Sequence, residues 1–467
     1  MEEQKYSIAN LDTTAIAGND FYQYATGGWA AANPMPNEYS RYGSFDQLAE
    51  NNQKQIKGII EELGKTKHEA GTVEQKIGDL YAIGMDSVKL NNDGATPIKA
   101  QLDHINKAAS MTDIIKLVGE LREYASSPFF GLYVAADDKN SSMNIVHLHQ
   151  AGIGLGEREY YLSQDSISEE IRKGYSNLIK TQFINTGYAE AEAVKAAETV
   201  LKIETALAKT HFKKEDTRKP ELNYHKIKVE DLDKQVEKFD WKTFFEAARA
   251  ENFTDLDVSQ IQPVAEGVKL IQTLPMDEVK TYLSWCVINT ASPYLSDKFI
   301  DANFEFYGKQ LSGRQAQQPR WKRTVSTVDG ALSEAVGQMY VAKYFPAEAK
   351  ERMLKLVKNL QVTLGERVNN LTWMSDVTKE KAQEKLNAFT VKIGYPDKWK
   401  DYSSLDIKND SYWENIVRAS KFEYDDMIKR IGKPVDRTEW HMPPQMVNAY
   451  YNPTTNEICF PAGILQP

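Results

Sequence analysis

The chain has 467 residues and a formal net charge of −9 at pH 7. An acidic surface repels phosphate groups, which argues against nucleic acids and anionic membranes as partners. No apolar run approaches the roughly 20 residues that cross a bilayer, so no transmembrane segment is expected. The two cysteines, Cys286 and Cys459, are too few for a disulfide framework or a thiolate metal site.

The N-terminal segment lacks the pattern of a targeting peptide and is expected to pack against the rest of the protein. Its first twelve residues, MEEQKYSIANLD, lack the basic and apolar regions of a signal peptide. Residues 18–29 are aromatic and then glycine-rich, which predicts a packed segment that turns at Gly27-Gly28.

The next segment combines a helix with a charged pair. Apolar residues at helical spacing predict a helix that follows residues 41–46 and ends at Gly64. Arg41 offers a planar fork to a carboxylate, and Asp46 is close enough in sequence to orient it. The alternative is an Arg-Asp pair that only fixes the start of the helix.

Histidines give two weak metal signals. His68-Glu69 begins like a zinc motif, but Thr72 stands where the second histidine is needed, so we interpret the segment as a polar connector. Residues 129–150 alternate across a polar turn and predict a hairpin in which His147 and His149 project from one face. Some metal sites use this spacing; the alternative is that both are packed or surface histidines.

The remaining chain is mostly helical in pattern. We expect Thr112 and Ser166 to begin helices as N-caps, and residues 297–320 to form a polar connection. Further helices are expected over residues 73–84, 166–212, 325–344, 346–371 and 375–389.

The last twenty-five residues predict a β-hairpin. Residues 447–452 alternate in side, residues 452–456 have turn chemistry, and Ile458 and Phe460 resume the alternation. A strand at a sheet edge offers free backbone groups to an extended peptide. Asn448 could bind both backbone groups of one peptide unit, because its amide presents a donor and an acceptor together. The alternative is that Asn448 caps the turn or the strand.

The residues of this predicted hairpin resemble a motif of a known protein family. Val447-Asn448-Ala449-Tyr450-Tyr451, with the run from Asn456 to Pro467, looks like the substrate-binding strand of the neprilysin family of zinc metallopeptidases, which includes the bacterial PepO-type endopeptidases. Residues 152–162, with Gly154 and Tyr161, resemble another family turn, and the likeness extends over essentially the whole chain.

The resemblance implies a mainly α-helical protein with small β-hairpins, built as two lobes around a cavity. Residues 1–29 would pack on the catalytic lobe, residues 30–410 would form the helical cap lobe, and residues 411–467 would begin a thermolysin-like catalytic lobe. The substrate-binding residues it implies are Asn448, Ala449 and Tyr450 at the substrate backbone, with Arg41 and Asp46 near the pocket for the substrate's C-terminal side. The alternative for Tyr450, and for Tyr451 beside it, is a packing residue of the hairpin.

The implied function is zinc-dependent hydrolysis of small peptides within the cavity. The family's HExxH helix follows a few dozen residues after this strand and is absent from the sequence, so we expect no catalytic residue and no metal ligand in this chain. The zinc and the catalytic groups would come from a C-terminal fragment of the same protein, without which the chain is expected to be inactive.

A second hypothesis is a peptide-binding or scaffold protein that has lost the metal lobe. The family favours an extracellular, periplasmic or cell-envelope location, and a cytoplasmic one is the alternative.

Overall fold

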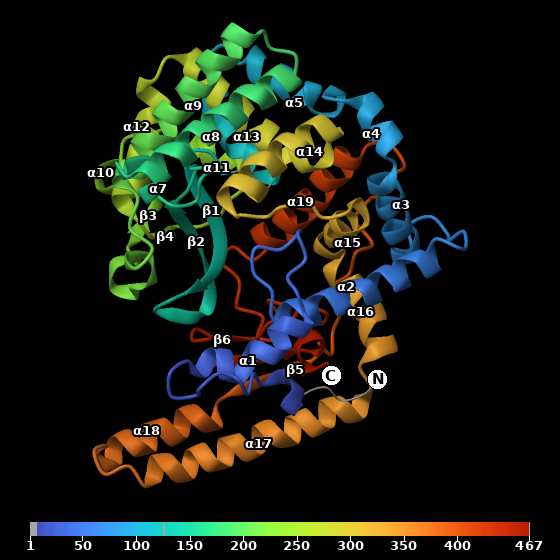
Figure 1. Ribbon diagram of the computed structural model, residues 1–467. Helices are drawn as coiled ribbons and strands as arrows, with labels where there is room; N and C mark the ends of the chain where they lie inside the picture. The colour runs from blue at the N-terminus through green and yellow to red at the C-terminus, as the bar shows by residue number, and fades with distance from the viewer. Residues whose placement is uncertain (1–6, 125–126, 467) are drawn as a thin grey trace.

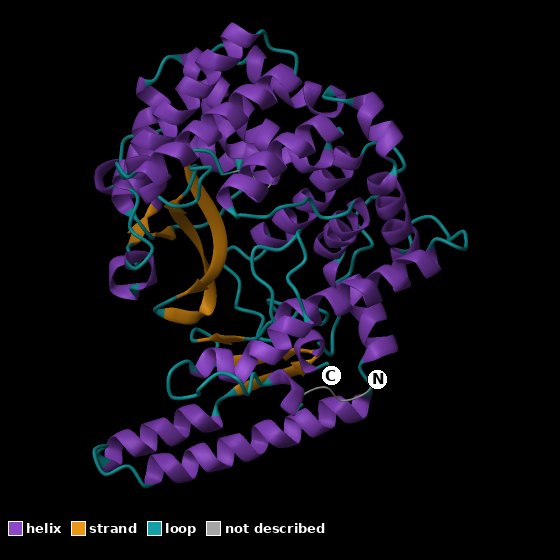
Figure 2. Cartoon of the chain, in the orientation of Figure 1, coloured by secondary structure: helices purple, strands orange, loops and turns teal. Residues whose placement is uncertain are grey.

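The structure is a computed structural model that describes residues 7–124 and 127–466. The first six residues of the predicted N-terminal segment and Pro467, the last residue of the C-terminal motif, lie outside the described residues. Helices dominate, and two small sheets lie between them (Figure 2). The prediction of a mainly helical fold with small sheets is confirmed. No helix of the described residues combines the length and apolar character that a membrane crossing needs.

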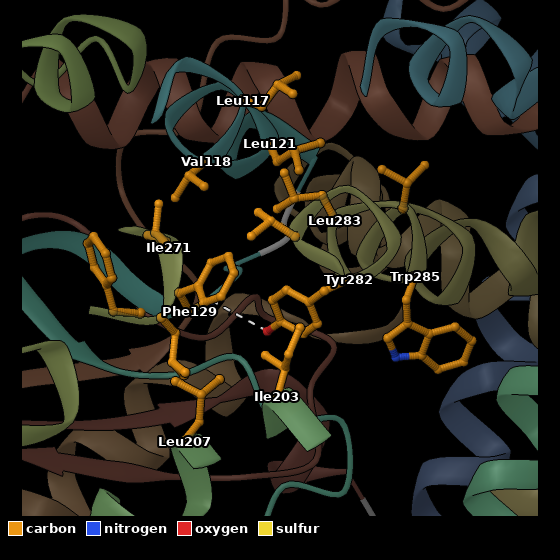
Figure 3. Packing of buried hydrophobic residues seen from close by; sticks show 14 of the residues in the cluster. Leu117, Val118, Leu121, Phe129, Ile203, Leu207, Ile271, Tyr282, Leu283 and Trp285 are labelled. Atoms are coloured by element: carbon orange, nitrogen blue, oxygen red, sulfur yellow. Dashed lines mark hydrogen bonds between the residues drawn. The ribbon is translucent and has the colours of Figure 1, made fainter. Parts of the chain in front are cut away.

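The upper lobe, residues 95–311, is a helical bundle around the first hydrophobic core (Figure 1). Buried residues from Ile98 to Phe306 form this core, and Trp413 joins them. Figure 3 shows its centre, where the hydroxyl of Tyr282 accepts a hydrogen bond from the backbone N–H of Phe129 at 3.4 Å. The same hydroxyl donates to the Gly152 carbonyl at 2.6 Å, so the tyrosine is satisfied despite complete burial. The helices of this lobe are α5 (Lys99–Lys107), α6 (Met111–Glu120), α7 (Glu159–Leu162), α8 (Ser166–Asn185), α9 (Glu190–Thr210), α10 (Leu232–Gln235), α11 (Trp241–Ala247), α12 (Ile261–Thr273), α13 (Met276–Ala291) and α14 (Asp297–Asn303).

A four-stranded sheet closes the underside of the upper lobe. Its order is β1-β2-β4-β3, with β1 (Phe130–Asp137), β2 (Asn140–Gln150), β3 (Lys226–Lys228) and β4 (Asp255–Val258). The hairpin predicted over residues 129–150 is confirmed, with β1 and β2 antiparallel. Phe130, Leu132 and Val134 alternate into the core, which leaves the other face of β1 for polar neighbours.

The lower lobe contains the other described residues and the second core. Ile56, Ile60 and Leu80 in this core pack against Val328 and Tyr340, which lie more than 200 residues later. The helix predicted before Gly64 is confirmed as α2. The helices of this lobe are α1 (Phe21–Ala32), α2 (Ser44–Leu63), α3 (Val73–Met85), α4 (Ser87–Asp93), α15 (Arg320–Ala331), α16 (Ser333–Tyr344), α17 (Ala347–Asn369), α18 (Asp376–Asn387) and α19 (Tyr412–Ile428).

A three-stranded sheet lies at the base of the lower lobe, above the hairpin of α17 and α18 in Figure 1. Its order is β5-β7-β6, with β5 (Thr390–Gly394) parallel to β7 (Glu457–Pro461) and β6 (Tyr450–Asn452) antiparallel to it. The predicted C-terminal hairpin therefore exists, although β6 begins three residues later than expected. The lobe boundaries predicted at residues 30 and 410 stay predictions.

Several local predictions were wrong. Gly27 and Gly28 do not turn the chain but lie inside α1, where a Cβ on Gly28 would stand 2.2 Å from the carbonyl oxygen of Ala9. These glycines allow the preceding segment to press against the helix. Ser110 and Asp165 cap α6 and α8 in place of Thr112 and Ser166, because their side chains accept the free N–H groups of the first turn.

Residues 297–320 are not a simple polar connection. Asp297–Asn303 forms α14, and Phe304–Leu311 continues it as a π-helix. Buried Phe299 and Phe306 anchor this helical segment to the upper core, which outweighs its polar composition.

Candidate functional site

A cavity of about 1290 Å³ lies between the two lobes. We call it the central cavity. Its upper wall is the polar face of the four-stranded sheet with residues 217–223, and its lower wall is residues 398–404, 426–441 and 452–457. Figure 2 shows the two sheets that contribute to these walls, one above the other. A space of this size accommodates a peptide of several residues.

Three aligned residues form the middle of the upper wall. Tyr133 on β1, His147 on β2 and Asp257 on β4 are register partners across neighbouring strands. The rings of Tyr133 and His147 stack with centroids 4.6 Å apart and planes within 4°. Cross-strand partners share one face of a sheet, so this row follows directly from the strand pairing.

The orientation of His147 is fixed by a carboxylate. Its Nδ1 lies 3.0 Å from Oδ2 of Asp257, and Ser259 Oγ donates to the same oxygen at 2.8 Å. The histidine and aspartate side chains are 5% and 2% exposed. An ionised carboxylate can only accept, so Nδ1 carries the hydrogen. Nε2 is buried without a hydrogen-bond partner among the described residues.

His149 is held in the same tautomer by a different group. Its Nδ1 donates to the carbonyl oxygen of Gln150 at 2.9 Å. A Cβ on Gly131 would lie 2.0 Å from Nε2 of His149, so only glycine at this position of β1 leaves room for the ring. Burial lowers the pKa of His149 to about 4, which makes the ring neutral at pH 7. The prediction that both histidines share one face is confirmed by the register.

A zinc site needs a defined set of protein ligands. Nowhere in residues 7–124 and 127–466 do three or more His, Cys, Asp or Glu side chains form a group that could hold a metal ion. Structural and catalytic zinc sites need at least three protein ligands. No group of side chains among the described residues offers such a ligand set.

The lower wall contains a buried ion pair. Glu457 on β7 accepts hydrogen bonds from Nζ of Lys392 at 2.9 Å and from the hydroxyl of Tyr450 at 2.8 Å. The side chains of Lys392 and Glu457 are 6% and 1% exposed. Burial raises the pKa of Tyr450 well above its ordinary value, so its hydroxyl stays protonated and donates. The three strands are thus tied by one polar network.

None of the five predicted substrate-binding residues lines the central cavity. Asn448 is exposed just before β6, and its Oδ1 accepts from the backbone N–H of Ala449 at 2.9 Å. Tyr450 lies in β6 with its hydroxyl engaged by Glu457. The next residues of the same hairpin, Asn452 and Thr454, do line the cavity. Among the described strands β6 lies at a sheet edge.

Arg41 and Asp46 are not joined by an ion pair in the described part of the chain. Oδ2 of Asp46 accepts instead from the backbone N–H of Gly43 at 2.9 Å, in a capping box that begins α2. Arg41 is exposed. Its guanidinium is available to a ligand, whereas Asp46 serves the helix.

A buried amide cluster connects α2 to the hairpin, and sequence reasoning did not identify it. Nδ2 of Asn52 donates to the carbonyl oxygens of Gln445 at 3.2 Å and Gly463 at 3.1 Å. Nε2 of Gln445 in turn donates to Asp329 at 2.5 Å and to the Ser333 carbonyl at 2.9 Å. Burial raises the pKa of Asp329 to about 6. The polar pair Asn52 and Gln445 gave no signal in the sequence, because each falls within an otherwise ordinary pattern.

Comparison with known proteins places the whole chain beside one group of enzymes. The family model described as peptidase family M13 matches residues 17–396. Endothelin-converting enzyme 1 of Homo sapiens is 31% identical over 483 residues, which cover 98% of this chain and 61% of that protein. The chain thus spans about three fifths of the length of this curated relative.

Solved structures give the same picture. The zinc metalloprotease Zmp1 of Mycobacterium tuberculosis, in complex with an inhibitor, is 34% identical with a TM-score of 0.93 over 99% of this chain and 70% of that chain. PepO of Lactobacillus rhamnosis is 22% identical with a TM-score of 0.85 over 97% of this chain and 72% of that chain, which shows a shared fold.

Proposed function

Because the chain belongs to peptidase family M13, we propose that it is the N-terminal part of a zinc-dependent endopeptidase that hydrolyses small peptides within a closed cavity. In this proposal the chain supplies the cap over the cavity and the strand that binds the substrate backbone.

The observation that carries this role is the position of β6. It is the outer strand of the sheet β5-β7-β6 in the described part of the chain, and Asn448 is exposed immediately before it. An edge strand presents unpaired backbone N–H and C=O groups, to which an extended peptide adds as a further strand. The Asn448 amide could then hold one peptide unit through both of its backbone groups. Ala449 and Tyr450 would continue the contact along the substrate backbone.

Arg41 and Asp46 would act on the other end of the substrate. Arg41 is exposed before α2, while Asn52 on the same helix is bonded to the loop that leads into β6. This link supports a shared site for the two segments. We propose that Arg41 binds a substrate carboxylate through its planar guanidinium, and that Asp46 maintains the helix start from which Arg41 projects.

Zinc and its ligands would be supplied by a C-terminal region that docks on the lower lobe. Bound zinc supplies a Lewis acid and lowers the pKa of its water to near 7. Exposed apolar side chains on α17 support a docking surface: Leu356, Leu360 and Leu364 follow one helix face and are 50%, 60% and 51% exposed. Trp373 and Val377, in and after the turn to α18, are 76% and 70% exposed.

The lobe division belongs to the same proposal. Residues 1–29 would pack on the catalytic lobe, 30–410 would form the cap, and 411–467 would begin the catalytic lobe. From the family alone, we also propose that the protein works outside the cytoplasm.

Peptide binding by the purified chain tests the substrate role. Equilibrium dialysis would compare fluorescent pentapeptides that differ only in a free or amidated C-terminus. We expect about tenfold tighter binding of the free carboxylate, as for a hydrogen bond between charged groups. Arg41→Ala should remove this preference, and Arg352→Ala, which changes an exposed arginine on α17, should keep it. Absence of binding would contradict the proposed role.

The partner is tested separately. Native mass spectrometry of the protein purified from its own source should show the HExxH region, either as a continuation of the chain or as a bound second polypeptide. A single species with the mass of this chain alone would contradict the proposal of a C-terminal partner.

A further inference from the structure

The upper wall of the central cavity contains polar groups that the proposed backbone strand does not use. His147, His149 and Asp257 lie on the polar face of the sheet, opposite the hairpin that contains β6. His147 Nε2 is an unpartnered polar atom on a side chain that is 5% exposed. A buried polar atom without a partner is costly, so its retention beside a cavity indicates a ligand.

The tautomers determine what that ligand must offer. His147 and His149 each commit the Nδ1 hydrogen, to the Asp257 carboxylate and to the Gln150 carbonyl. In a neutral imidazole the second nitrogen is then an acceptor. With both rings neutral, the Nε2 atoms are the acceptors of this wall, and a matching ligand must bring N–H or O–H donors.

The carboxylates near His147 add negative charge. Asp138 lines the cavity at the end of β1, and it forms no hydrogen bond or ion pair with another described residue. Partial burial raises the pKa of Asp138; the nearby His147 opposes this rise, and the carboxylates of Asp257 and Asp137 add to it. Lys226 on β3 is already paired with Asp137 at 2.9 Å, and the ammonium of Lys139 lies over the ring of Tyr224. A cationic donor would complement the charge of these carboxylates.

We propose that the sheet wall centred on His147 and Asp138 recognises a primary ammonium group of a bound peptide, with the N-terminal ammonium as the ligand. The inference rests on the proposed function and deepens it, because it assigns the amino end of the substrate to the upper lobe. Asp138 supplies the opposite charge and His147 Nε2 accepts a hydrogen from the ammonium. The ring of His147 stacks on the ring of Tyr133, and this stacking fixes the direction in which Nε2 of His147 points.

Fluorescence anisotropy of the full chain can test this with a matched peptide pair. The probes are a five-residue peptide with a C-terminal fluorophore and either a free or an acetylated amino terminus. We expect acetylation to weaken binding about tenfold. Asp138→Asn changes an exposed side chain and His147→Phe keeps a ring on Tyr133; both should abolish the difference. The matched control His104→Phe, at an exposed histidine on α5, should preserve it.

A third probe separates the two possible sources of an ammonium group. An acetylated peptide with one internal lysine should bind as weakly as the acetylated parent if the N-terminus is recognised. Equal binding of this probe and the free-amine peptide would overturn the assignment to the N-terminus.

The other possible results show whether the ammonium site alone, or peptide binding as a whole, is wrong. If the free amine is preferred equally by wild type and both variants, the ammonium site lies elsewhere and the inference is wrong while peptide binding stands. If acetylation has no effect, the inference is wrong as well. If no peptide binds, the proposed function fails, and the inference fails with it.

Discussion

Asn52 on α2 and Gln445 in the loop before β6 are bonded through the Asn52 amide and the Gln445 carbonyl at 3.2 Å, although 393 positions separate them in the sequence. The same amide reaches Gly463 beyond β7. One side chain therefore holds both ends of the C-terminal hairpin against α2. The position of the proposed substrate strand depends on this contact.

Removing the Asn52 amide should destabilise the lower lobe. Asn52→Ala leaves two carbonyl oxygens without their donor, and each unsatisfied buried group costs about 1–3 kcal/mol. We expect a loss of about 2–4 kcal/mol in the free energy of unfolding. Urea denaturation measures it, with Asn409→Ala, at an exposed asparagine, as the control. A variant as stable as wild type would show that the contact contributes nothing.

Gly463→Ala tests how closely the backbone at Gly463 packs against the loop at Gln445. The added Cβ would lie 2.3 Å from the Gln445 carbonyl oxygen, which forces the loop away. Overpacking of this kind costs about 1–3 kcal/mol. Gly330→Ala, where no atom lies within 4 Å of the new Cβ, should be neutral or slightly stabilising. Differential scanning calorimetry should show a lower melting temperature only for the first variant.

Because of buried Glu204, the free energy of unfolding should decrease as the pH rises from 4.5 through 7. Burial raises its pKa to about 7, from an ordinary 4.5, while Tyr161, Tyr175 and the Gly154 N–H bond to it. The folded state binds this proton more tightly than the unfolded state does. Protonation of Glu204 therefore contributes about 3 kcal/mol to the free energy of unfolding below pH 4.5. This contribution is lost as the pH rises through 7.

The check is urea denaturation between pH 5 and 8 with Glu204→Gln. The variant should lose most of this slope. Asp329, whose pKa burial raises to about 6, acts in the same direction and is present in both proteins, so only their difference reports Glu204. Parallel slopes in the two proteins would refute the prediction.

Loss of one partner from the buried pair of Lys392 and Glu457 should destabilise the protein strongly. Lys392→Met leaves the Glu457 carboxylate buried beside Tyr450 with no counter-charge, which costs about 3–5 kcal/mol. Lys381→Met removes an exposed partner of Glu384, whose side chain is 64% exposed, and should change stability little. Thermal unfolding of both variants measures the contrast. Equal losses of stability in the two variants would mean that burial does not determine how much an ion pair contributes.

The sequence predicted elements whose pattern is local. The hairpin of β1 and β2 and the helices α2 and α18 have clear periodicity and end signals, and the structure confirms them. The strand β5 was missed because its partner β7 follows more than sixty residues later. A short apolar run after a helix has no period of its own, and only this distant pairing makes it a strand.

The site was harder to predict for a physical reason. Asn448, Ala449, Tyr450, Arg41 and Asp46 came from the family resemblance, and their roles stay predictions. The bonds of Asn52, Gln445 and Asp329 join three distant segments, so no spacing in the sequence encodes them.

Hydrogen exchange at β6 tests the central claim most directly, that this edge strand receives a peptide backbone. Exchange of the amides of residues 448–452 would be followed by mass spectrometry with and without a saturating peptide. We predict that a peptide slows exchange here about tenfold, that the same peptide with N-methylated backbone does not, and that Asn448→Ala weakens the effect. Unchanged exchange over residues 448–452 in the presence of bound peptide would contradict the account.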